Sequence, residues 1–129
     1  MIGVYIEPIF YTKITNKNGK TLITKKQTRR KVISNSTAFI IKDILTEPVQ
    51  GSHGTATNCS ISGMDVAAKT GTTDDDYDRW LCGFTNYYTA VTWYGFDLNE
   101  NIEYGSNQNP ASVLWSSIMS SIHKGLSRK

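Results

Sequence analysis

Three β-strand patterns that follow one another between residues 65 and 97 constrain the fold most strongly. They cover about 65–72, 79–85 and 88–97 and are rich in β-branched and aromatic residues, with only short turns between them. Connections this short join antiparallel strands, because parallel neighbours need a crossover of a dozen or more residues. Neither alternating set of residues in the third strand is strongly polar, which predicts that both of its faces are covered. The segment is therefore expected to form a three-stranded meander at about 65–97.

A hairpin is predicted ahead of this meander, at about 4–25. The stretch from Val4 to Thr15 has the composition of a strand, and Pro8 within it indicates a bulge or an edge position. Asn18-Gly19 is a strong hairpin turn signal. The return strand begins at about Thr21.

Two amphipathic helices are also predicted. The first spans about 36–48, with Ser34 or Ser36 as its cap. The second spans about 110–126, where Asn109-Pro110 is a typical helix start. Each helix needs a partner for its apolar stripe, and the sheet is the expected one. The stripes are Ala38, Ile41, Leu45 and Val49 in the first helix, and Leu114, Ile118, Ile122 and Leu126, widened by Trp115 and Met119, in the second.

These elements predict an α+β fold, an antiparallel sheet with packed helices. The length of 129 residues suits one domain or one piece of a larger domain. The opening MIGVYIEP has the character of a protein interior behind an initiator Met, so an excised fragment is expected. No run approaches the roughly 18 apolar residues of a membrane span, and no signal peptide is visible. We therefore expect no direct membrane insertion by this chain.

The stretch GMDVAAKTGTT, Gly63 to Thr73, differs by one residue from the phosphate-binding loop G-x-x-x-x-G-K-[ST]. Ala68 stands where the second glycine is needed and adds a Cβ where the backbone must approach a phosphate. A phosphate loop also needs a helix after it, whereas Lys69 and Thr70 lie in a β-like segment and precede another strand. The order of elements therefore disfavours nucleotide binding.

On a strand, the same residues favour a different chemistry. Lys69 and Gly71 face one side of an extended chain, and Thr70 and Thr72 face the other. The lysine supplies positive charge, the hydroxyls supply donors, and the glycine lets another backbone approach an edge. Such a strand can hold a peptide-like substrate that ends in a carboxylate. A backbone N–H at its end can also stabilise an acyl oxyanion.

The charged residues are unevenly distributed within a net charge of +3. Six basic residues lie between 20 and 31, but they lack the interleaved aromatics that stack bases, so no nucleic-acid partner is expected. Four aspartates lie between 74 and 78 with the rhythm of a calcium loop. Arg79 and Thr85 stand where that loop requires Gly and Glu, which indicates a solvated turn instead.

The cysteines and histidines indicate neither a metal site nor a cofactor. Cys59 and Cys82 are too few for a disulfide framework or a zinc site, and two buried thiols are expected, with a lone disulfide as the alternative. His53 lies in a Gly- and Ser-rich loop without a paired ligand. His123 flanks the apolar stripe of the last helix, which favours a structural role over a Ser-His-Asp triad.

A set of motifs around Lys69 resembles the transpeptidase domain of bifunctional (class A) penicillin-binding proteins. The resemblance covers nearly the whole chain and is specific as a set. Ala68 departs from it, because glycine is common there in the family, but the change is small on a strand. The motifs are Lys69 to Thr73, Asp78-Arg79-Trp80, Gly83-Phe84-Thr85 and Trp93 to Asp97, with Gly54-Thr55-Ala56 and the predicted helix and hairpin upstream.

The resemblance implies part of a β-lactamase/transpeptidase-like fold and the chemistry of peptidoglycan cross-linking. In that family a serine in a Ser-x-x-Lys motif attacks the stem peptide and forms an acyl-enzyme, and β-lactams acylate the same serine. At the matching positions Lys69 would supply positive charge, and Thr70 and Thr72 would hold the carboxylate of substrate or antibiotic. The backbone N–H of Thr72 would form half of the oxyanion hole, and Gly71 would leave the strand unobstructed.

The implied partners are the stem peptide, β-lactams and the rest of the transpeptidase domain, at the extracytoplasmic face of the bacterial cell membrane.

The family's Ser-x-x-Lys and Ser-x-Asn motifs precede Lys-Thr-Gly in chain order, and no Ser-x-Asn is present here. The Ser-x-x-Lys from Ser121 to Lys124 follows it, in the last helix, where the family has no catalytic residue. We expect residues 1–129 to be a C-terminal portion of the domain, inactive alone. A noncatalytic peptide- or protein-binding module is the alternative.

Overall fold

The computed structural model describes residues 3–105 and 107–128. The chain divides into two compact units, Met1–Ile41 and Lys42–Lys129. The first unit is built from two short antiparallel strand pairs, and the second from a three-stranded antiparallel sheet with helices. This mixture of helices and antiparallel sheet confirms the predicted α+β class.

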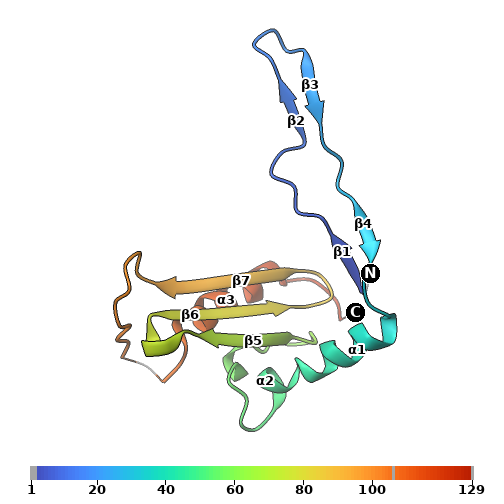
Figure 1. Cartoon of the computed structure of the whole chain (residues 1–129). Coiled ribbons are helices and arrows are strands. Elements are labelled where there is room, and N and C mark those ends of the chain that lie inside the picture. The colour runs from blue at the N-terminus through green and yellow to red at the C-terminus, as the bar shows by residue number, and fades with distance from the viewer. Residues whose placement is uncertain (1–2, 106, 129) are drawn as a thin grey trace. The chain divides into compact units, whose positions relative to one another are not determined.

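In the first unit, the predicted hairpin is divided into two strand pairs (Figure 1). The strand β1 (Val4–Ile6) pairs with β4 (Arg29–Lys31), and β2 (Lys13–Thr15) pairs with β3 (Thr21–Thr24). The single strand expected from Val4 to Thr15 is therefore interrupted, and Pro8, which has no N–H to donate, lies in the interruption.

The β2–β3 turn and the gap between the pairs are both closed by local hydrogen bonds. The side-chain oxygen of Asn16 accepts from the N–H groups of Asn18 and Lys20, at 3.0 and 2.9 Å. The Glu7 carboxylate accepts from the Thr28 hydroxyl at 2.5 Å and from Lys25 at 3.1 Å. These bonds, first from Thr28 and then from Lys25, lower the pKa of Glu7. The contacts hold the chain together where the strand ladder is absent.

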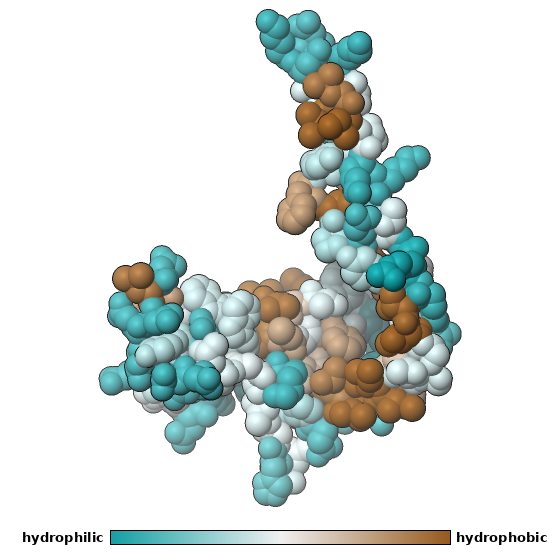
Figure 2. Space-filling model, in the orientation of Figure 1, coloured by the Kyte–Doolittle hydropathy of each residue, from teal (hydrophilic) through white to brown (hydrophobic). Residues whose placement is uncertain are grey.

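The hairpin exposes apolar as well as basic side chains. Figure 2 shows apolar surface on this hairpin, where Ile14, Leu22 and Ile23 are exposed. Every residue of β2, β3 and β4 is exposed. Two strands cannot enclose a core of their own, which is why these side chains remain at the surface.

The helix α1 spans Asn35–Ile44 and begins at the predicted cap. The Ser34 hydroxyl accepts from the N–H of Thr37 at 3.0 Å. The helix ends before the predicted boundary, and a separate short helix, α2 (Glu47–Gln50), follows. Pro48 explains the break, because it has no N–H to bond to the carbonyl of Ile44 and its ring would clash there.

Only one member of the stripe predicted for the first helix, Val49, is buried, and it lies in α2. The helix α1 contains no buried residue. The packing role predicted for the first helix therefore falls to α2, which contacts the sheet strand β5 and the 3-10 turn η1 (Thr57–Cys59).

The sheet consists of β5 (Ala67–Thr72), β6 (Asp78–Phe84) and β7 (Thr89–Gly95) in that order, all antiparallel. The 3-10 turn η2 (Asp74–Asp76) joins the first two strands. The helix α3 (Pro110–Ile122) lies against one face of this sheet (Figure 1). Within residues 3–105 and 107–128, Val91 and Trp93 on the other face of β7 are 55% and 40% exposed, so the prediction of a strand covered on both faces is wrong for this part of the chain.

The residues of the predicted stripe that α3 buries are the two that widened it, and the main line of that stripe is partly exposed. Leu114, Ile118 and Ile122 are each 45–46% exposed, whereas Trp115 and Met119 are completely buried. The two stripes are offset by one residue and have the same spacing, so helical periodicity alone does not distinguish them. The buried residues of α3 and its C-cap are Ala111, Ser112, Trp115, Met119 and His123.

One hydrophobic cluster joins these elements and includes one of the two cysteines. Cys59 is fully buried in it, and burial raises the pKa of its thiol to about 11. Cys82 is exposed on β6, and both thiols are free, so the expectation of two buried thiols holds for one of them. The cluster is Val49, Ala56, Cys59, Val66, Ala68, Leu81, Ala111, Trp115 and Met119.

Candidate functional site

The candidate residues lie on β5, which is an edge strand of the sheet in the described part of the chain. Thr70 is opposite Leu81 in the β5–β6 ladder, so Thr70 and Thr72 share the face that α3 covers. Lys69 and Gly71 lie on the other face. The alternation expected from the sequence is therefore present in the strand.

The backbone groups of Thr70 and Thr72 point away from β6. The N–H of Ala68 donates at 2.8 Å to the carbonyl of Leu45, which lies outside the sheet. Because antiparallel residues alternate between pairing inward and pointing outward, Thr70 and Thr72 share the outward orientation of Ala68. The Lys69 ammonium accordingly reaches the outward carbonyl of Thr70 at 2.9 Å. This edge therefore offers backbone donors, backbone acceptors and a cation together.

Thr55 is a neighbour of the site whose position sequence reasoning did not predict. Its hydroxyl lies 3.1 Å from that of Thr70. The segment is positioned by Ala56, which is fully buried and donates its N–H to the carbonyl of Pro48 at 2.8 Å. Gly54 is needed beside it, because a Cβ at this position would overlap the same carbonyl. The Gly-Thr-Ala pattern was the sequence signal for this contact.

A cavity of about 570 Å³ lies beside this end of β5. It brings His53 and Lys69 into one lining, although the sequence had placed His53 in a loop with no partner. The remaining walls come from α2 and the residues around it. The lining residues are Ile44, Leu45, Glu47, Pro48, His53, Gly54, Thr55 and Lys69.

The Thr72 hydroxyl has a cationic neighbour on β6. Arg79 lies directly opposite Thr72 and donates from Nη1 to its Oγ1 at 2.9 Å. The same guanidinium forms an ion pair with Asp76 at 3.0 Å and lies 5.5 Å from the centre of the Tyr104 ring. Sequence reasoning assigned Arg79 no part in the site, and the cross-strand register is what reveals it.

The acidic turn after β5 is occupied by internal contacts. Asp78 accepts from the Thr73 hydroxyl at 3.1 Å and from the indole N–H of Trp93 at 2.7 Å. Asp75 and Asp76 have positive φ, which closes the turn. Residues 3–105 and 107–128 contain no group of three His, Cys, Asp or Glu side chains placed to hold a metal ion. The Asp-x-Trp and Trp-x-Gly motifs thus join the three strands to one another.

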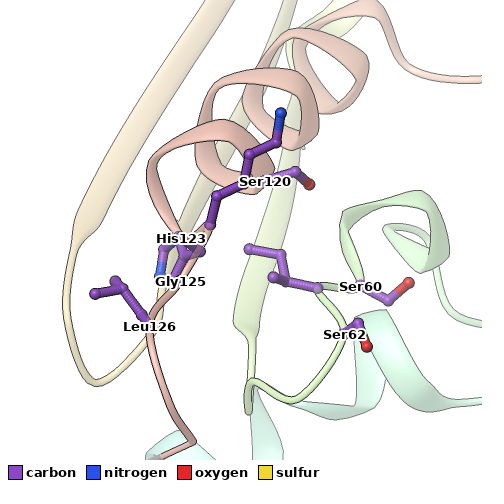
Figure 3. A pocket seen from close by; sticks show the side chains of 8 residues that line it. Ser60, Ser62, Ser120, His123, Gly125 and Leu126 are labelled. Carbon is purple, nitrogen blue, oxygen red and sulfur yellow. The ribbon is translucent and has the colours of Figure 1, made fainter.

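A second cavity, of about 400 Å³, lies at the C-terminal end of α3 (Figure 3). His123 lines it, but both ring nitrogens are hydrogen-bonded, Nδ1 with the Met119 carbonyl at 2.6 Å and Nε2 with the Thr85 hydroxyl at 2.8 Å. Tyr88 packs edge-on against the ring at 5.3 Å between centroids. These contacts give His123 a structural role. Ser121 of the Ser-x-x-Lys sequence is exposed near this end of α3.

Known structures share the fold of this chain. The chain superposes on a crystal structure of penicillin-binding protein 1A from Haemophilus influenzae with a TM-score of 0.71, 21% identity, and coverage of 99% of this chain and 25% of that one. For the D,D-transpeptidase domain of a peptidoglycan glycosyltransferase from Eggerthella lenta, the TM-score is 0.64 and the identity 27%, covering 96% and 29%. The fold is therefore that of penicillin-binding transpeptidase domains, with the β-lactamase-like architecture.

Sequence comparisons agree with this fold. The family described as penicillin binding protein transpeptidase domain matches residues 2–114. Penicillin-binding protein 1A of Clostridium botulinum (strain Langeland) is 39% identical over 127 residues, covering 98% of this chain and 15% of the relative. The chain belongs to the penicillin-binding protein transpeptidase domain family, and the resemblance found in its motifs is confirmed. It spans about 15% of that relative's length.

Proposed function

We propose that this segment supplies the substrate-binding edge strand of a D,D-transpeptidase domain that cross-links peptidoglycan. The observation that carries the proposal is the open edge of β5, where the outward backbone groups of Thr70 and Thr72 lie beside their hydroxyls and the Lys69 ammonium. An extended peptide can pair with such an edge through its backbone. Its terminal carboxylate then meets hydroxyl donors near a positive charge.

Each residue has a distinct task in this proposal. Thr70 and Thr72 donate to the carboxylate of the stem peptide or β-lactam, and Lys69 supplies positive charge. The outward N–H of Thr72 is one donor to the acyl oxyanion. Gly71 leaves the strand unobstructed, and a Cβ added at this position would lie 3.2 Å from the Cβ of Trp80 on β6. The serine nucleophile is contributed from outside residues 1–129.

The same family membership supports a proposal for the place of action. We infer that the complete domain works at the extracytoplasmic face of the bacterial cell membrane, where peptidoglycan is assembled. Across residues 3–105 and 107–128, no helix is long and apolar enough to cross a membrane.

A chimera tests the assignment, because acylation requires a complete domain. This segment replaces the matching 127 residues of the C. botulinum relative, and labelled penicillin is used to measure covalent modification. Modification of the chimera and a sharp reduction by Lys69→Ala are expected. Lys124→Ala, which removes a lysine at the end of α3, is the matched control and should leave labelling unchanged. Equal labelling of the Lys69→Ala chimera and its parent would reject the role of Lys69.

Experiments on the segment alone distinguish this proposal from a noncatalytic binding module. Intact-mass analysis after penicillin treatment should show no adduct, and an adduct on Ser121 would overturn the assignment of the nucleophile to another part of the domain. The open edge of β5 also favours plain peptide binding as a second candidate. NMR shift changes at β5 on addition of a D-Ala-D-Ala peptide, without acylation of the chimera, would favour that module.

A further inference from the structure

Arg79 is held in one position by contacts with three separate segments of the chain. Its Nη1 donates to Thr72 Oγ1 on β5 at 2.9 Å, its Nη2 pairs with Asp76 of η2 at 3.0 Å, and its guanidinium lies 5.5 Å from the Tyr104 ring centre. The side chain is 15% exposed, whereas that of Asp76 is 58% exposed. An arginine with these contacts has little rotational freedom, because its planar fork is fixed at both terminal nitrogens.

The remaining guanidinium nitrogen, Arg79 Nε, shows that this position is energetically unfavourable for the side chain in one respect. Arg79 Nε is buried without a hydrogen-bond partner, and it is the single side-chain atom of this kind in residues 3–105 and 107–128. A buried donor left unpaired is unfavourable, because it has lost its hydrogen bonds to water without replacing them. The arginine therefore occupies a place that does not satisfy its own hydrogen-bonding capacity.

The contact with Thr72 has a direct chemical consequence. A hydroxyl has one proton to donate and lone pairs that accept. Because Arg79 donates to Thr72 Oγ1, the Thr72 proton points elsewhere and is available to an acceptor at the β5 edge. The exposed Asp76 offsets much of the guanidinium charge, so the arginine acts on the hydroxyl's orientation more than through long-range attraction.

From this geometry we propose that Arg79 is a positioning residue that turns the Thr72 hydroxyl toward a carboxylate at the β5 edge. The site thereby selects ligands with a free carboxylate over otherwise identical neutral ones. This inference rests on the proposed function of β5. It adds a specificity determinant on the neighbouring strand, outside the Lys-Thr-Gly-Thr sequence.

The test compares one ligand in two charge states. In the C. botulinum chimera, the second-order rate constant of acylation is measured for benzylpenicillin and for its methyl ester. Arg79→Gln should slow acylation by the free acid about tenfold, near the contribution of one hydrogen bond to a charged group, and leave the ester rate unchanged. An equal loss for acid and ester would identify a merely structural role and overturn the proposal, and so would an unchanged rate for the acid.

Two further variants separate geometry from charge. Arg79→Lys keeps the charge but lacks the planar fork, and its rate with the free acid should fall between those of the parent and Arg79→Gln. Complete restoration by lysine would show that charge suffices and overturn the positioning role. Arg128→Gln is the matched control, since Arg128 is 71% exposed and paired with Asp65, and it should alter neither rate.

Failure of the underlying function is recognised separately. If the chimera with Arg79 intact is not acylated, the transpeptidase proposal fails, and the Arg79 inference is decided with the 129-residue chain itself. There the Thr72 amide shift is followed by NMR during titration with an acetylated D-Ala-D-Ala peptide and with its C-terminal amide. A preference for the free carboxylate that disappears in Arg79→Gln supports the inference. The same preference in both proteins, or none in either, overturns it.

Discussion

The indole ring of Trp115 lies directly over the backbone of Gly83. A β-carbon at Gly83 would lie 2.7 Å from Cζ2 of Trp115, inside van der Waals contact. The indole N–H donates to the carbonyl of Ala90 on the next strand at 3.0 Å. The glycine of the Gly-aromatic-Thr motif is therefore the position at which α3 is packed onto the sheet.

Replacing this glycine should destabilise the second unit. Gly83→Ala is expected to lower the free energy of unfolding by about 1–3 kcal/mol, because the added methyl group forces the buried indole or the strand to move. Urea unfolding followed by tryptophan fluorescence measures the effect. Gly105→Ala is the matched control, since nothing lies within 4 Å of its added Cβ. Equal stability of the two variants would contradict the packing role of Gly83.

The threonine of the same motif should be as sensitive. Thr85 Oγ1 accepts from the N–H groups of Tyr87 and Tyr88 at 3.1 and 3.3 Å and contacts His123 Nε2 at 2.8 Å. Thr85→Val keeps the shape but leaves these groups without their partner, so a loss of about 2 kcal/mol or more is expected. Thermal unfolding with Thr89→Val, an exposed site on β7, as control tests this. A neutral Thr85→Val would mean that water replaces the hydroxyl.

The two stripes of α3 should differ sharply in their contribution to stability. Met119→Ala removes a fully buried side chain and should destabilise the fold by about 2–5 kcal/mol. Leu114→Ala, where 46% of the residue surface is exposed, should cost less than about 1 kcal/mol. Chemical unfolding of both variants ranks the two faces. A larger effect at Leu114 would show that the Leu114 side of the helix is the packed one.

The buried thiol should make stability depend on alkaline pH. Burial raises the pKa of Cys59 from 9.0 to about 11, so the unfolded chain ionises this thiol before the folded chain does. Its contribution is fully present below pH 9 and is lost as the pH rises toward about 11. The loss is measured by urea unfolding in a Cys82→Ser background. The measurements run from about pH 8 to about pH 11, the range over which the thiol ionises in the unfolded and then in the folded chain. Cys59→Ala should remove this part of the pH dependence, and identical slopes for the two proteins would contradict it.

Local patterns were sufficient for much of the fold. The alternating strands at 65–97 and their short turns predicted the antiparallel meander, because turn length restricts how neighbouring strands connect. Asn109 caps α3 as expected, with its side chain accepting from the N–H of Ala111 at 2.9 Å. The strand after Lys69 likewise excluded the phosphate loop. Each of these features depends on residues that are close together in the chain.

Other features depended on partners that are distant in sequence. The stripe of α3 that packs was decided by the space above Gly83, which a helical period cannot report. The position of Arg79 beside Thr72 depends on the register between β5 and β6, and a shift of one residue would place it on the opposite face. The site was therefore predicted as a set of residues on one strand, without its neighbours.

The sequence by itself determined the α+β class, the family and the strand on which Lys69, Thr70, Gly71 and Thr72 lie, because each depends on local pattern or on motif order. Only the tertiary structure decided that this strand has an open edge, that Thr55 approaches Thr70, and that Arg79 donates to Thr72. The physical reason is that edges, registers and packed faces are relations between segments. Their energies come from contacts that form only when distant parts of the chain meet.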